Sequence, residues 1–210
     1  MPKDVYPDSG FRLPLVKRED LDDYGKKVYD QMFGPTGNTL AGMRGPSGIR
    51  MYSPKVAELQ YALNQYLRYQ SGLSAPIREL AILVTARAIN HPFEWAPHEK
   101  KGLQDGLPQG IIDVVKYRRG VEGLPETEAV VIQLGRQIFE KRKVDSAVFA
   151  RALKAFGAKQ LVELVSLVVA WLPIYHSLSQ ECSLLDKPPI LRLLTLSSSP
   201  LVETLSSLSV

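Results

Sequence analysis

The feature that most constrains the fold of this chain is a segment from Ser74 to Asn90 that is apolar on almost every side. Ser74 followed by Pro76 is typical of a helix start, with serine as the cap and proline in the first turn. A helix that is apolar all round belongs in the interior of a fold, so the sequence predicts a central, buried helix here. Glu79 and Arg87 stand out within it as charged residues. Its apolar residues are Leu80, Ala81, Ile82, Leu83, Val84, Ala86, Ala88 and Ile89.

The rest of the chain also has the periodicity of helices, and no segment alternates between apolar and polar residues as a half-buried strand does. Asp20 and Pro54 mark two further helix starts, and Pro97 predicts a kink or a fresh start in the helix that carries His98. The expected fold class is therefore all-α, a helical bundle with a central helical hairpin. The other predicted helices span residues 21–33, 54–71, 109–117, 126–142, 145–156 and 159–180, and a loop is expected over residues 39–48.

The chain divides into three parts. Residues 1–38 form an N-terminal extension with one predicted helix, residues 39–182 form the main domain, and residues 183–210 form a tail. The tail is rich in serine and leucine, contains Pro188, Pro189 and Pro200, and has no clear helical face. We expect it to be disordered or loosely packed.

Composition and charge exclude several classes of function. The single cysteine, Cys182, leaves no thiol pair for a disulfide or for dithiol redox chemistry within one chain. The net charge is +4, with lysine and arginine scattered along the chain, so we expect no nucleic-acid partner. The longest apolar run, residues 161–172, is too short for a membrane helix, and the polar start does not resemble a signal peptide. We expect a cytoplasmic protein with no membrane partner.

Ionisable residues gather between Glu79 and His98, in and just after the predicted central helix. If the chain is helical from Pro92, Glu94 and His98 share one face, and Glu79 meets that face from the preceding helix of a hairpin. Glutamate and histidine exchange protons near neutral pH, so this set predicts acid–base catalysis. The alternative is a structural hydrogen bond between two packed helices.

Metal binding is a second chemical interpretation of the same stretch. His91, Glu94 and His98 are suitable ligand types for zinc or iron. Their spacing differs from the His-Glu-x2-His pattern of known zinc helices, and Pro97 disturbs the helix. We therefore assign no metal and no cofactor to the site.

Four residues are candidates for binding a small-molecule substrate. Arg87 lies in the central helix, His91 and Trp95 lie beside the acid–base residues, and Arg50 flanks the turn at residues 45–48. The planar fork of an arginine suits a carboxylate. Trp95 is placed to wall a pocket, although packing is the commoner role for a tryptophan at a helix junction.

Two stretches of the sequence resemble the core motif of a known family. The first is Ser74-Ala75-Pro76-Ile77-Arg78-Glu79-Leu80-Ala81-Ile82-Leu83-Val84-Thr85-Ala86-Arg87, followed by Phe93-Glu94-Trp95 and His98. The second is Gly45-Pro46-Ser47-Gly48-Ile49-Arg50 with Ser53-Pro54. Both are similar to the carboxymuconolactone decarboxylase family of the alkylhydroperoxidase-D-like superfamily, and the similarity covers about residues 40–180.

The resemblance implies an all-α, alkylhydroperoxidase-D-like bundle that assembles as a homo-oligomer, a trimer or a hexamer. In the peroxidase branch, a glutamate and a histidine match Glu79 and His98, and His91 and Glu94 occupy the positions of the two redox cysteines. Because that mechanism needs a thiolate and a resolving thiol, we do not expect peroxidase activity. The decarboxylase branch lacks these cysteines and has a Glu-Trp pair like Glu94-Trp95.

The resemblance also implies a function. We expect a cofactor-free decarboxylase or isomerase acting on a small carboxylated lactone or ring acid, with His98 as the general acid/base. Glu79 would orient His98 or relay its proton, Glu94 would be a second proton carrier, and Arg87 or Arg50 would hold a substrate carboxylate. A non-catalytic or repurposed oligomeric family member is the alternative, followed by a metal-dependent enzyme.

Overall fold

The computed structural model describes residues 5–9, 11–39, 42–44 and 46–169. This part of the chain is built from eight α-helices and contains no β-sheet, which confirms the all-α fold class. The helices are α1 (Asp23–Phe33), α2 (Pro46–Arg50), α3 (Pro54–Tyr69), α4 (Ala75–Ala88), α5 (Pro92–Gln104), α6 (Gln109–Lys116), α7 (Glu126–Arg136) and α8 (Ser146–Val169). Two 3₁₀ turns, η1 (Arg18–Asp20) and η2 (Gly42–Arg44), and a π-helical turn, η3 (Gln137–Lys141), complete them.

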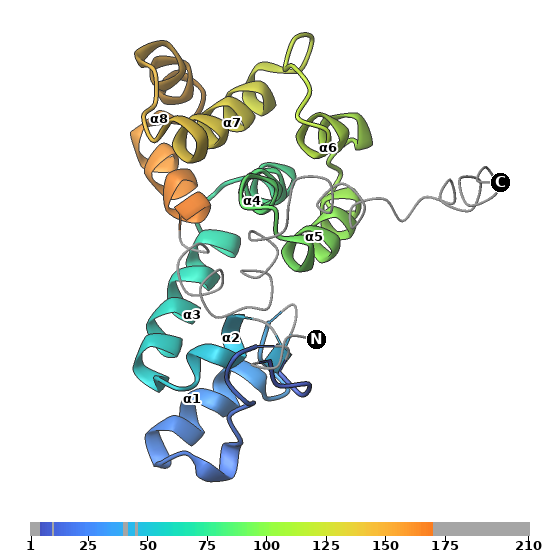
Figure 1. The fold of residues 1–210 in the computed structure, drawn as a ribbon. Coiled ribbons are helices and arrows are strands. Elements are labelled where there is room, and N and C mark those ends of the chain that lie inside the picture. The colour runs from blue at the N-terminus through green and yellow to red at the C-terminus, as the bar shows by residue number, and fades with distance from the viewer. Residues whose placement is uncertain (1–4, 10, 40–41, 45, 170–210) are drawn as a thin grey trace, which may run out of the picture.

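Helix α4 lies at the centre of the molecule, with α5, α6, α7 and α8 around it (Figure 1). Most of its residues are buried, and Leu80 and Leu83 have no exposed surface. It forms one apolar core with side chains of α6, α7 and α8. Burying each large apolar side chain contributes roughly 1.5–3 kcal/mol. The central, buried helix predicted from the sequence is therefore confirmed.

Helix α5 is attached to this core differently. Of its residues, only His98 and Gly102 are buried. A Cβ atom added to Gly102 would lie 3.3 Å from Leu107 Cδ2 and 3.5 Å from Glu79 Cβ. The helix therefore approaches α4 closely at a glycine and at a polar side chain, and Trp95 is its partly buried apolar contact with the core.

The N-terminal helices have a core of their own. Val28 and Met32 of α1 pack with Met51 and Ala57, and these elements lie together at the lower end of the molecule in Figure 1. Helix α1 begins after Asp22, whose Oδ1 accepts a hydrogen bond from the Gly25 amide at 2.7 Å. The prediction of Asp20 as the cap was therefore wrong by two positions.

Two other local predictions differ from the structure. Residues 46–48, the end of the loop predicted over 39–48, belong to α2. Helix α5 continues through Pro97, so the predicted fresh helix start there is absent. The predicted break near residue 157 is present, since Gly157 has a left-handed φ of 69° inside α8. Cys182, the tail and the end of the helix predicted over 159–180 lie outside the described residues.

No helix in these described ranges is both long enough and apolar enough to span a membrane.

We predict that Gly135→Ala destabilises the protein, because α4 and α7 cross at this glycine. The added Cβ would lie 2.3 Å from Cγ1 of Val84, a stiff, β-branched side chain that is buried. Overpacking of this kind costs about 1–3 kcal/mol. Urea denaturation measures the free energy of unfolding.

The matched control is Gly110→Ala in α6, where an added Cβ meets nothing within 4 Å. Because alanine is the better helix former, this control should stabilise by about 0.5–1 kcal/mol. In the double variant Val84→Ala/Gly135→Ala, the loss should be smaller than the sum of the two single losses. Additive losses would contradict the predicted clash.

Candidate functional site

A tight turn sets α5 beside α4. Asn90 adopts a left-handed φ of 52°, a conformation that asparagine tolerates better than most residues. The His91 amide then donates to the Ala86 carbonyl at 2.8 Å. His91 caps α5, since its Nδ1 accepts a hydrogen bond from the Glu94 amide at 3.2 Å. The two helices therefore form the predicted hairpin.

The hairpin brings Glu79 of α4 against His98 of α5. Oε2 of Glu79 lies 2.6 Å from Nδ1 of His98. Only 1% and 2% of the two side-chain surfaces are exposed. A carboxylate and an imidazole this deeply buried are stable only when they are paired. The contact predicted from the sequence is therefore present.

The structure adds Arg68 of α3, which sequence reasoning missed. Its Nη2 donates to Oε1 of Glu79 at 3.4 Å, and the side chain is buried. Arg68 lies three helical turns after Ala57, so it falls on the face of α3 that the buried Ala57 occupies. The burial of this face is known only from the structure, so the sequence alone did not indicate it.

Glu94 extends the pair toward the surface. Its Oε2 lies 3.5 Å from Nε2 of His98, one helical turn away, and 13% of its side chain is exposed. A continuous chain of ionisable groups thus runs from Arg68 through Glu79 and His98 to Glu94. We call it the proton chain.

The two carboxylates change the proton affinity of His98. Burial lowers the pKa of the imidazole, but the hydrogen bonds and charges of Glu79 and Glu94 outweigh this effect and raise the pKa above its usual value. The imidazole is therefore charged over a wider pH range than a free histidine, which suits a group that donates protons near neutral pH.

Arg50, at the end of α2, is a cation whose charge interacts with that of Glu94. Only 7% of the residue is exposed. Burial lowers the pKa of its guanidinium, and the charge of Glu94 partly offsets this. Within the described part of the chain its buried Nε has no hydrogen-bond partner. A buried guanidinium in this state favours an anionic partner such as a carboxylate.

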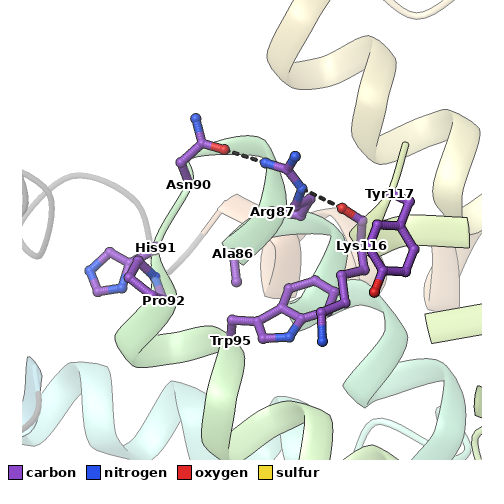
Figure 2. Close-up of a pocket in the computed structure, with 8 residues that line it drawn as sticks. All are labelled: Ala86, Arg87, Asn90, His91, Pro92, Trp95, Lys116 and Tyr117. Atoms are coloured by element: carbon purple, nitrogen blue, oxygen red, sulfur yellow. Dashed lines mark hydrogen bonds between the residues drawn. The ribbon is translucent and has the colours of Figure 1, made fainter. Parts of the chain in front are cut away.

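The other three predicted substrate-binding residues lie elsewhere. Arg87, His91 and Trp95 line a cavity of about 390 Å³, together with Ala86, Asn90, Pro92, Lys116 and Tyr117 (Figure 2). Glu79, Glu94, His98 and Arg50 do not line it. The catalytic candidates and Arg50 therefore lie outside this cavity.

The described residues offer no group of three or more histidine, cysteine, aspartate or glutamate side chains arranged to hold a metal ion. His91, Glu94 and His98 do not form such a group, since Nδ1 of His91 accepts the Glu94 amide hydrogen bond. The geometry gives the metal-binding interpretation no support.

Comparisons of the chain with models of known protein families, with characterised proteins and with solved structures return no match. The family relationship therefore stays a proposal and rests on the residues quoted for it.

We predict that Glu94→Gln lowers the pKa of His98, because it removes one of the two carboxylates that raise it. The chain has three histidines, so an NMR titration of their ring protons is readily assigned. The midpoint of His98 should lie above 6.5 in the wild type and move down in the variant. Glu99→Gln, on the same helix, should leave the midpoint in place, and an unchanged midpoint in Glu94→Gln would contradict the proton chain.

The raised pKa of His98 also makes the free energy of unfolding depend on pH. The folded protein binds the His98 proton more tightly than the unfolded chain does, so the stabilisation is fully present below pH 6.5. It is lost as the pH rises through the higher folded-state pKa. The free energy of unfolding should fall less over this range in Glu94→Gln than in the wild type.

Proposed function

We propose that this protein is a cofactor-free decarboxylase or isomerase of a small carboxylated lactone or ring acid. The observation that carries the proposal is the proton chain, which leads from the buried Glu79 through His98 to the partly exposed Glu94. The buried guanidinium of Arg50 acts electrostatically on the exposed end of this chain. A proton carrier beside a carboxylate receptor is what such a reaction needs.

In the proposed reaction, Arg50 binds the substrate carboxylate or the oxygen that becomes negative. Loss of CO2 breaks a carbon–carbon bond and leaves its electron pair on a ring carbon, in a dienolate-like system. Glu94 delivers a proton to that carbon, and His98 resupplies Glu94. Because His98 is almost fully buried, it acts through Glu94 and not by direct contact with the substrate. In the isomerase variant, the same groups remove and return a proton without loss of CO2.

The charges of the site also favour an anionic substrate. Two carboxylates, of Glu79 and Glu94, face two guanidinium groups, of Arg50 and Arg68. The cluster is therefore neutral while His98 is neutral and carries one positive charge when His98 is protonated. A substrate carboxylate compensates this charge and stabilises the form of His98 that can donate a proton.

The proposal includes membership of the decarboxylase-like branch of the alkylhydroperoxidase-D-like superfamily. The residues that matched the family's glutamate and histidine, Glu79 and His98, are in contact, and Glu94 is the next group along. The deep burial of His98 is the observation that favours the alternative, a repurposed member in which the pair only joins α4 to α5. Activity measurements separate the two.

We predict that the wild type releases CO2 from a member of a panel of γ-lactone and muconate-type acids, followed by mass spectrometry. In D2O the product should gain deuterium at the carbon that was protonated. Loss of a positioned acid lowers kcat by about 100- to 10,000-fold, and this is the expected effect of Glu94→Gln and of His98→Gln. Arg50→Gln should mainly raise KM.

Glu126→Gln on α7 is the control, because that carboxylate is exposed and pairs only with Arg151 in the described structure. It should retain wild-type kcat. Full activity in His98→Gln, or no turnover by folded wild type on the whole panel, would favour the repurposed family member over the enzyme.

The proposal also includes a homo-oligomer, which an exposed apolar stripe on α3 supports. Val56, Leu59, Leu63 and Tyr66 follow one another at helical spacing and are each more than a third exposed. An apolar stripe on a helix face marks an interaction surface. We propose a second copy of the chain as the partner.

We predict that the wild type is a trimer or hexamer by light scattering and that Leu59→Glu/Leu63→Glu dissociates it, because four carboxylate oxygens enter the apolar stripe of each copy. Lys100→Glu on α5 changes the net charge by the same amount at an exposed site and should leave the assembly intact. A monomeric wild type would contradict the proposed oligomer.

A further inference from the structure

The cavity that the proton chain does not use has the composition of a ligand site. It lies where the end of α4, the start of α5 and the end of α6 meet, and Figure 2 shows Arg87 and Asn90 above the ring of Trp95 in this view. Trp95 and Tyr117 supply aromatic surface, and Ala86 and Pro92 supply apolar surface. A volume of about 390 Å³ is within the usual range for small-molecule pockets.

Trp95 is held in one orientation. Its Nε1 donates to Oε2 of Glu99 at 2.7 Å, and the other oxygen of Glu99 accepts from Nζ of Lys116 at 2.9 Å. Lys116 also lies 5.9 Å from the centre of the Trp95 ring. An aromatic wall fixed in this way costs little conformational entropy when a flat ligand stacks on it.

Arg87 brings positive charge that no carboxylate of the described residues compensates. Its Nε donates to the Lys116 carbonyl at 2.8 Å, and its Nη1 donates to the side chain of Asn90. Among the described residues it contacts no carboxylate, and its Nη2 makes no hydrogen bond. The neighbouring cations differ, because Lys116 pairs with Glu99 and Arg118 pairs with Glu140.

The electrostatic environment of Arg87 also favours an anionic ligand. Burial lowers the pKa of its guanidinium, and the positive charge of Arg118 lowers it further. An anion at this position would relieve both effects. The guanidinium fork suits a carboxylate, which accepts two parallel hydrogen bonds.

We infer that this cavity is a binding site for a planar aromatic carboxylate, with its ring on Trp95 and its carboxylate on Arg87. The site is distinct from the proton chain, since neither Glu94 nor His98 lines it. The inference therefore does not depend on the proposed function.

Intrinsic fluorescence tests this site directly. The chain has two tryptophans, Trp95 and Trp171, so Trp171→Phe leaves Trp95 as the sole reporter. Benzoate should quench its emission saturably, with a dissociation constant on the order of 1 mM or tighter for so small a ligand. Calorimetry on the unmodified protein should give the same constant.

Two analogues of the probe separate charge from ring. Benzamide keeps the ring and loses the charge, and cyclohexanecarboxylate keeps the charge and loses the aromatic face. Each should bind at least tenfold more weakly than benzoate. Equal affinity for all three compounds would overturn the inference, because the binding would then need neither Arg87 nor Trp95.

Matched variants separate this cavity from the proton chain. Arg87→Gln should weaken benzoate at least tenfold and leave benzamide unchanged, and Arg87→Lys should recover part of the loss. Arg151→Gln on α8, where the arginine pairs with Glu126, is the control and should bind benzoate as the wild type does. Loss of binding in Arg50→Gln with none in Arg87→Gln would place benzoate beside Glu94, and the absence of saturable quenching would also overturn the inference. Circular dichroism confirms that each variant is folded.

Discussion

The hydrogen bond between Glu79 and His98 is the interaction on which the arrangement of both candidate sites depends. Helix α5 buries only His98 and Gly102, whereas α4, α6, α7 and α8 share a large apolar core. The position of α5 is therefore set by one buried polar contact, one glycine, the turn at Asn90 and the packing of the partly buried Trp95 on the core. A buried polar pair is directional, so it fixes α5 in rotation and register more tightly than an apolar contact would.

A chain of charges in an apolar interior is stable only if each member has a partner. Arg68 and His98 provide partners for Glu79, and His98 lies between two carboxylates. Arg50 lies outside the proton chain, but its charge interacts with that of Glu94, and its buried Nε has no hydrogen-bond partner in the described structure. Each inner charge of the proton chain therefore has a partner, whereas an anion can bind at the outer end. The proposed reaction requires an anion-binding group at that end.

The sequence predicted the parts of this structure that depend on local chemistry. The central helix followed from its apolar residues, and the contact of Glu79 with His98 followed from helical spacing and a hairpin. Arg68 was missed, because its partner Glu79 lies on another helix and spacing along α3 does not reveal that contact. The separation of Arg50 from Arg87 was missed for the same reason, since one-dimensional spacing does not say on which side of a helix a cavity opens.

The position of α5 as a shared wall has a thermodynamic consequence. One side of this helix carries Glu94 and His98, and another carries Trp95, with His91 capping the start between them. A ligand that displaces α5 from the cavity side alters the distance from His98 to Glu94, and hence the proton affinity of His98. By reciprocity, protonation of His98 then changes the affinity of that ligand by the same factor. Ligand binding in the cavity and protonation of His98 would in this way be thermodynamically coupled through α5, although the two sites share no residue.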